Sequence, residues 1–351
     1  MTVRVEKPSI NVREKLAELD KPTGIAGEAM LRAETPQEQF NLIGAGRRNL
    51  IINGDCNISQ RGDFTTASSA SDETYYLDRF EQNLGTVTAN KQHITSNQPS
   101  SLSNTKSWKL TATSTANGFM GTRQTIEDYK LFNGREFTAS VWVKTNHPSV
   151  RFYLYDGSNT DQGKKTAVAD GEWHYLQETF TFDATAGTKF SIEVIILSEA
   201  GSNTSITSGD YVEFTGLQLE VGKVATPFEH RSYGEELALC QRYFERISSE
   251  GNGRSLFAAG YNESTSTARW ILNYEKKRSA PTINDGGGVE NFGILHTSTT
   301  LSLNTLTFDQ ATTRSCRCLG ESTGTPLTDG GASILCSVDS DVAYIDIDSE
   351  L

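Results

Sequence analysis

The middle of the chain contains successive segments in which apolar and polar side chains alternate, and this pattern restricts the fold more than any other feature. The alternation is strongest at 137–144, and further strand-like segments follow at 150–155, 173–182, 190–197 and 211–220. A period of two places one face of a strand on a core and the other toward solvent. Strands that recur roughly every 10 to 20 residues, without helices between them, predict an antiparallel sandwich.

The composition agrees with a mainly β chain of more than one domain. Only 36% of the 351 residues are hydrophobic, and the 30 glycines suit short strands joined by polar turns. This length is enough for two or three domains with cores of their own. Three further strand-like segments, at 255–259, 267–274 and 301–308, predict a second, smaller β-domain.

Residues 1–46 differ from the rest because their pattern is helical. Within 11–19 the apolar side chains recur at helical spacing, and Thr35 followed by Pro36 is a typical start for a second short helix. Two helices of about ten residues cannot bury a core by themselves. They therefore need a partner, which we expect to be another copy of the chain or a docking surface.

A third helix is predicted at 234–247, between the two β-domains. Ser232 and Glu235 form a capping box at its start. Four apolar residues then follow at spacings of three and four, and they make up a candidate trimer seam: Leu237, Cys240, Phe244 and Ile247. Such a seam can face a symmetry axis or pack on its own domain, and both interpretations stay open.

These patterns divide the chain into four parts. They are an N-terminal segment with short helices, a sandwich domain, a linking helix and a C-terminal β-domain, at 1–46, 47–232, 233–248 and 249–351. In the last ten residues acidic and apolar side chains alternate, which is typical of an edge strand protected against further pairing.

The charge and the N-terminus exclude several classes of partner. The formal net charge of −12 repels phosphate backbones, so we expect no nucleic-acid partner. No run of about 18 apolar residues occurs, so membrane insertion is not expected. Residues 1–20 lack the apolar core of a signal peptide. Synthesis in a cytoplasm followed by release through lysis fits these features.

Motifs for catalysis and metal binding are scarce. No nucleophile elbow, zinc-protease helix or phosphate-binding loop occurs, and the five histidines are scattered, so we expect no enzyme activity. Cys316 and Cys318 are two apart, without the second pair or the histidine of a zinc site. We interpret the five cysteines as structural thiols, with a metal or disulfide role as the alternative.

One set of side chains suits sugar binding. Trp142 lies opposite the valines of its strand, and Arg151, Tyr153 and Tyr155 share one face of the next strand. Aromatic rings are amphipathic platforms that can stack on sugar rings, while polar neighbours bond the hydroxyl groups. We predict that these four residues form one patch on one sheet, with ordinary packing as the alternative.

Several longer motifs resemble those of bacteriophage tail fibre proteins. Asn53-Gly54-Asp55 and its flanking residues are similar to the opening of a domain that is common in these fibres. The closing segment of the same domain has the longest similarity, from 216 to 244. The matching segments extend over most of the chain: 24–40, 49–62, 76–80, 216–222, 225–231, 234–244, 279–282 and 348–351.

The resemblance implies a jelly-roll domain similar to carbohydrate-binding modules, in a homotrimeric fibre. Residues 1–46 would attach to tail or adaptor proteins of the virion, and the distal domains would contribute to adhesion through host surface polysaccharide. The alternatives are an adaptor or accessory fibre without receptor contact and a polysaccharide-degrading tailspike, whose usual long β-helix repeat is missing here.

The same resemblance bears on cofactors. Related jelly rolls hold a calcium ion, and such an ion would use Asp55, Asp78 and Asp210, which flank strand ends. No linear calcium-binding loop occurs in the sequence, and no other cofactor is expected.

Overall fold

The structure is a computed structural model that describes most of the chain after residue 47. The described residues are 48–102, 105–155, 161–165, 168–182, 189–198, 205–249, 254–297, 299–338 and 343–351. The two predicted N-terminal helices lie outside them. The chain divides into two units, Met1–Leu50 and Ile51–Leu351, and the second contains every strand named below.

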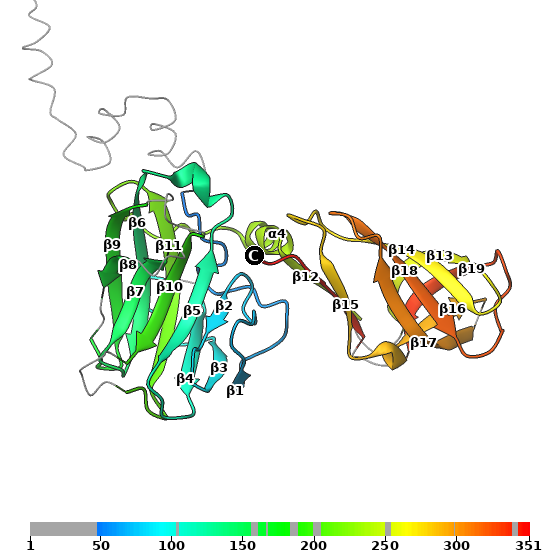
Figure 1. Cartoon of the computed structure of the whole chain (residues 1–351), viewed down its shortest axis with the longest axis horizontal. Helices are drawn as coiled ribbons and strands as arrows, with labels where there is room; N and C mark the ends of the chain where they lie inside the picture. Colours follow the sequence, from blue (N-terminus) through cyan, green and yellow to red (C-terminus); the bar gives the residue numbers. More distant parts are fainter. Residues whose placement is uncertain are drawn as a thin grey trace, which may run out of the picture. The chain divides into compact units, whose positions relative to one another are not determined.

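Two antiparallel sheets face each other in the first part of this second unit (Figure 1). The larger sheet has six strands in the order β1 Ser68–Ala70, β3 Ala89–Ile94, β4 Ser107–Ala112, β11 Tyr211–Val221, β6 Glu136–Thr145 and β9 Trp173–Thr181. The smaller sheet has five, in the order β2 Glu81–Asn83, β5 Phe119–Thr125, β10 Ser191–Leu197, β7 Val150–Tyr155 and β8 Asp161–Lys165.

The core lies between these sheets, and β7 shows the predicted alternation most clearly. In β7 the side chains of Val150, Phe152 and Leu154 are buried, and the residues between them are only half-buried. Val141 and Val143 of β6 are buried in the same way. Each such side chain contributes about 1.5–3 kcal/mol when it is removed from water. The predicted antiparallel sandwich in a mainly β chain is confirmed.

Residues from 244 onward form a three-stranded sheet and a closed barrel. The sheet has the order β12 Phe244–Ser248, β20 Tyr344–Asp348 and β15 Thr282–Gly286. The barrel closes through β13 Leu256–Asn262, β14 Thr267–Asn273, β18 Ser315–Ser322, β17 Thr299–Asp309, β16 Phe292–His296 and β19 Ala332–Ser337. The predicted second β component is therefore present.

The barrel interior explains the spacing of two cysteines. Cys316 and Cys318 occupy alternate positions of β18, so both point into the core, where Trp270 is also buried. All five cysteines of the chain are buried.

The last strand is not an edge strand, and that prediction is wrong. β20 pairs with β12 on one side and with β15 on the other. Its Ile345 and Ile347 are fully buried, whereas Asp346 accepts two hydrogen bonds from Arg246, each at 2.6 Å. Both neighbouring strands come from distant segments, so the local alternation could not reveal them.

The linking helix is shorter than predicted. α4 Tyr233–Gln241 begins with the predicted capping box, in which the Ser232 hydroxyl accepts a hydrogen bond from the Glu235 amide. The Glu235 carboxylate accepts one from the Ser232 amide, at 3.0 Å. After Gln241 the chain turns and becomes β12, which pairs with β20 along its whole length.

The predicted helical seam of Leu237, Cys240, Phe244 and Ile247 does not form, because its last two members lie in β12. Cys240 is fully buried, and Ile247 packs against the barrel core. Backbone pairing with β20 outweighs the helical spacing of these residues. The homotrimer itself stays a prediction, as do the proposed divisions at 46, 232 and 248.

Removal of the cap should weaken this helix measurably. Ser232→Ala leaves the Glu235 amide without its acceptor, so we expect a loss of about 1 kcal/mol in the free energy of unfolding. Urea denaturation followed by circular dichroism measures it. Ser208→Ala, in an exposed turn, is the matched control; equal losses for both variants would contradict a specific role for the cap.

Candidate functional site

The four residues predicted to bind sugar do not share one sheet. Trp142 lies in β6 of the six-stranded sheet, whereas Arg151, Tyr153 and Tyr155 lie in β7 of the five-stranded sheet. The connection at 146–149 carries the chain from one sheet to the other instead of closing a hairpin. The prediction of a single patch is therefore wrong, although the three β7 residues do share a face.

The face that carries Tyr153 also carries a row of polar residues from three other strands. Tyr153 pairs in register with Glu193 of β10, Glu193 pairs with Arg123 of β5, and Arg123 pairs with Glu81 of β2. Directly opposed residues point to the same side of a sheet. The four side chains therefore lie side by side on the face opposite the core.

Hydrogen bonds join this row. The Tyr153 hydroxyl donates to Glu193 Oε2 at 2.8 Å, and Asn83 Nδ2 donates to the same oxygen at 3.2 Å. Arg123 donates to both carboxylate oxygens of Glu81, each at 2.7 Å. Such a bidentate pair holds both groups in one geometry. We call Glu81, Asn83, Arg123, Tyr153 and Glu193 the polar row.

The polar row is partly removed from water. Glu193 is only 1% exposed, and burial raises its pKa, although Tyr153 and Arg123 act in the other direction. At one end of the row, the Lys189 ammonium lies 5.2 Å from the centre of the Tyr155 ring, and burial lowers the pKa of this lysine. A desolvated set of fixed donors and acceptors beside an aromatic ring suits a ligand rich in hydroxyl groups.

The sequence pattern indicated Tyr153, which belongs to the polar row, and Tyr155, which lies beside it, but not the other four members of the row. A usable signal was present in Glu193, because it is a carboxylate inside the apolar run 190–197. Arg123 and Glu81 gave no such signal, since only the register of separate strands brings them together.

Trp142 belongs to a different surface. Its ring lies 5.3 Å from that of Tyr175, with 47° between their planes, on the outer face of the six-stranded sheet. Trp142 is half-buried, and Tyr175 is 43% exposed. The two sheets thus carry aromatic residues on opposite outer faces of the sandwich.

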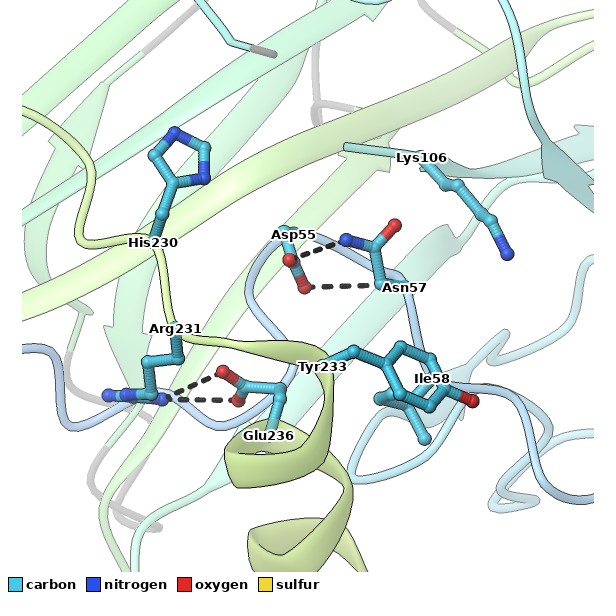
Figure 2. Close-up of a pocket in the computed structure, with 8 residues that line it drawn as sticks. All are labelled: Asp55, Asn57, Ile58, Lys106, His230, Arg231, Tyr233 and Glu236. Atoms are coloured by element: carbon cyan, nitrogen blue, oxygen red, sulfur yellow. Dashed lines mark hydrogen bonds and ion pairs between the residues drawn. The ribbon is translucent and has the colours of Figure 1, made fainter. Parts of the chain in front are cut away.

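A pocket of about 630 Å³ lies beside the start of α4 (Figure 2). One wall is the loop 53–58, in which Asp55 accepts hydrogen bonds from the amide and the side chain of Asn57 at 3.3 and 2.6 Å. The opposite wall contains Arg231, whose guanidinium lies 3.1 Å from Glu236 Oε1. Burial raises the pKa of both carboxyl groups, Asp55 and Glu236.

The three aspartates considered for calcium do not form one site. Asp55 bonds Asn57, Asp78 bonds Gln60 and Arg61, and Asp210 bonds Thr207 at the turn before β11. Within the described part of the chain, no three acidic, histidine or cysteine residues come together in a way that could hold a metal ion. Each aspartate interacts with different neighbours, so the three do not converge on one ion.

Residues 72–201 match the model of a family described as a carbohydrate binding domain. This segment contains every strand of the polar row. The chain therefore includes a domain similar to a carbohydrate binding domain. A search of curated proteins found no match. No helix in the described ranges is long and apolar enough to cross a membrane.

Several solved structures match parts of this chain at low identity. A Stig cyclase from Fischerella sp. TAU is 13% identical over 51% of this chain and 98% of its own, with a TM-score of 0.37. The first CBM22 xylan-binding domain of Xyn10C from Paenibacillus barcinonensis is 13% identical over 48% and 100%, with a TM-score of 0.29. A putative sugar-binding protein from Bacteroides thetaiotaomicron is 13% identical over 50% and 100%, with a TM-score of 0.30.

Proposed function

We propose that this chain is a structural subunit of a phage tail fibre and that the polar row of its sandwich binds a surface polysaccharide of the host. The observation that supports this most strongly is the row itself. Five polar side chains from four strands meet on one sheet face, inside the segment that matches the carbohydrate binding domain.

The chemistry of the row suits sugar hydroxyl groups. Glu193 and Glu81 accept hydrogen bonds, Arg123 and Asn83 donate them, and their mutual contacts fix the side chains before a ligand arrives. Each Glu81 oxygen accepts one bond from Arg123 and keeps a second lone pair for a sugar hydroxyl group. Preorganised groups lose little conformational entropy on binding. The Tyr155 ring, at the edge of the row, offers a surface on which a sugar ring can stack.

The assignment to a tail fibre rests on sequence similarity outside the matched domain. Segments 24–40, 49–62 and 216–244 resemble tail fibre proteins. On this basis residues 1–46 attach the subunit to tail proteins, three copies form the fibre, and the protein is part of the virion. The polar row is proposed as a binding surface without catalysis, because its carboxylates are occupied by Arg123, Tyr153 and Asn83.

Removal of one charge from the row should weaken binding strongly. Glu193→Gln keeps the shape of the side chain but loses a charged acceptor, so we expect affinity for the polysaccharide to fall about tenfold. Calorimetric titration with purified capsular polysaccharides and O-chains measures the change. The exposed Glu172→Gln is the matched control. Equal affinities for wild type and Glu193→Gln would contradict binding at the row.

The assembly and the lack of catalysis need separate measurements. The mass of the full chain in solution should correspond to three copies, and an antibody against the C-terminal barrel should label the phage tail in electron micrographs. A stable monomer would contradict the homotrimer. Release of reducing ends from the bound polysaccharide would contradict a purely binding role and favour a depolymerising tailspike.

A further inference from the structure

The pocket beside α4 is a second candidate site, separate from the polar row. Of its lining residues only Lys106 falls within 72–201; the others come from the loop 53–58 and from the segment that enters α4. Figure 2 shows these side chains around one hollow, with Asp55 and Asn57 in the middle and the pair Arg231–Glu236 at one side.

The loop 53–58, which forms one wall of the pocket, is held rigidly. Asn53 and Cys56 both adopt left-handed backbone conformations, with φ of 62° and 56°. The Asn53 side chain closes the loop, because its amide group donates to the Ile58 carbonyl at 2.8 Å and accepts from the Ile58 amide at 2.8 Å. Non-glycine residues in this conformation are costly and persist only where surrounding contacts enforce them. The loop therefore presents Asp55 in a fixed position.

The charges around the pocket balance each other. Lys106 and Arg231 are cations, and Asp55 and Glu236 are carboxylates. This mixture disfavours a phosphate or another polyanion, because two carboxylates would face it. A metal ion is disfavoured because, among the described residues, no three histidine, cysteine or acidic side chains come together in a way that could hold one. What remains is a small neutral molecule with both donors and acceptors.

The other groups in the pocket specify such a molecule further. Both Asp55 oxygens hold bonds from Asn57 and still have lone pairs for further donors. Tyr233 is 64% exposed at the rim, and its ring lies near the apolar side chain of Ile58. A flat apolar surface beside fixed hydrogen-bonding groups matches the two kinds of surface on a pyranose ring.

We propose that this pocket binds a single neutral sugar residue, with Asp55 accepting from its hydroxyl groups, Lys106 donating to them and Tyr233 stacking on the ring. The inference rests on the proposed glycan-binding function, and it adds a second subsite to the polar row. A branched or folded polysaccharide could then contact the domain at two points, which increases its effective affinity.

The test uses the full chain and methyl glycosides of neutral hexoses and N-acetylhexosamines as probes, followed by saturation-transfer NMR and calorimetry. Lys106→Met and Tyr233→Ala should each weaken glycoside binding by about tenfold. Lys130→Met and Tyr175→Ala, at exposed positions outside both sites, are the matched controls and should leave it unchanged. Thermal unfolding checks that all variants are folded.

The outcomes separate this proposal from the proposed function. If the chain binds polysaccharide but no glycoside, the proposal for the pocket is wrong and the proposal for the polar row stands. Glycoside binding that survives both pocket substitutions would also overturn the proposal for the pocket. A third outcome is that the pocket variants lose glycoside binding while the wild-type chain retains no polysaccharide. This would support the pocket and overturn the function proposed for the polar row.

Discussion

Replacing Glu350 by glutamine should lower the free energy of unfolding by about 3 kcal/mol, because it leaves a buried arginine without its counter-charge. Arg79 is 2% exposed and forms an ion pair with Glu350, which is 5% exposed. The Arg79 guanidinium also donates to the Thr125 carbonyl at 2.9 Å and lies 3.5 Å from the centre of the Tyr243 ring. These contacts cannot replace the lost charge.

The comparison with an exposed pair makes this prediction specific. Lys223 and Glu136 also form an ion pair, but their side chains are 70% and 43% exposed. Water and salt screen such a pair, so Glu136→Gln should change the free energy of unfolding by less than about 1 kcal/mol. Urea denaturation of both variants decides the matter. Similar small losses for both would contradict the view that the 348–351 segment is fastened to the sandwich through Arg79.

The stability of the fold should fall as the pH rises toward neutrality and beyond. Asp78 is fully buried, and burial raises its pKa to about 7, although Arg61 at 3.5 Å acts in the other direction. The nearby Glu350 carboxylate contributes to this rise in the pKa of Asp78. The folded chain therefore holds the Asp78 proton more tightly than the unfolded chain does. Its contribution to stability is greatest below the ordinary carboxyl pKa and is lost as the pH rises through about 7.

The substitution Asp78→Asn isolates this effect from the other titrating groups. The variant side chain cannot ionise, so only the wild type loses stability as the pH rises through about 7. The difference in free energy of unfolding, variant minus wild type, should therefore increase by about 3 kcal/mol between pH 5 and pH 8.5. Denaturation curves at both pH values measure the difference. A difference that is independent of pH would show that Asp78 has the same pKa in the folded and unfolded chains, contrary to the expectation.

Much of the fold could be predicted because strand alternation is a local property. The segments around Val141 and Phe152 bury alternate side chains, and each is recognisable from neighbouring residues alone. The errors concern long-range pairing. Phe244 and Ile247 continue a helical spacing in the sequence, yet β12 pairs with β20 about a hundred residues later. No local pattern contains that information.

The candidate site was only partly predictable for the same reason. The shared face of Tyr153 and Tyr155 follows from their spacing, so it was found. The partners Glu193, Arg123 and Glu81 depend on the register of three more strands. Trp142 was placed with the tyrosines because consecutive strands usually pair, whereas here the chain crosses to the other sheet.

Hydroxyl-radical footprinting of the full chain, with and without bound polysaccharide, tests most directly which face binds the glycan. Aromatic side chains are oxidised according to their exposure, so both outer faces report in one experiment. Binding at the polar row should reduce oxidation of Tyr153 and Tyr155 and leave Tyr175 and Trp142 unchanged. Protection of Tyr175 and Trp142 instead, with Tyr153 and Tyr155 unaffected, would contradict the proposed site.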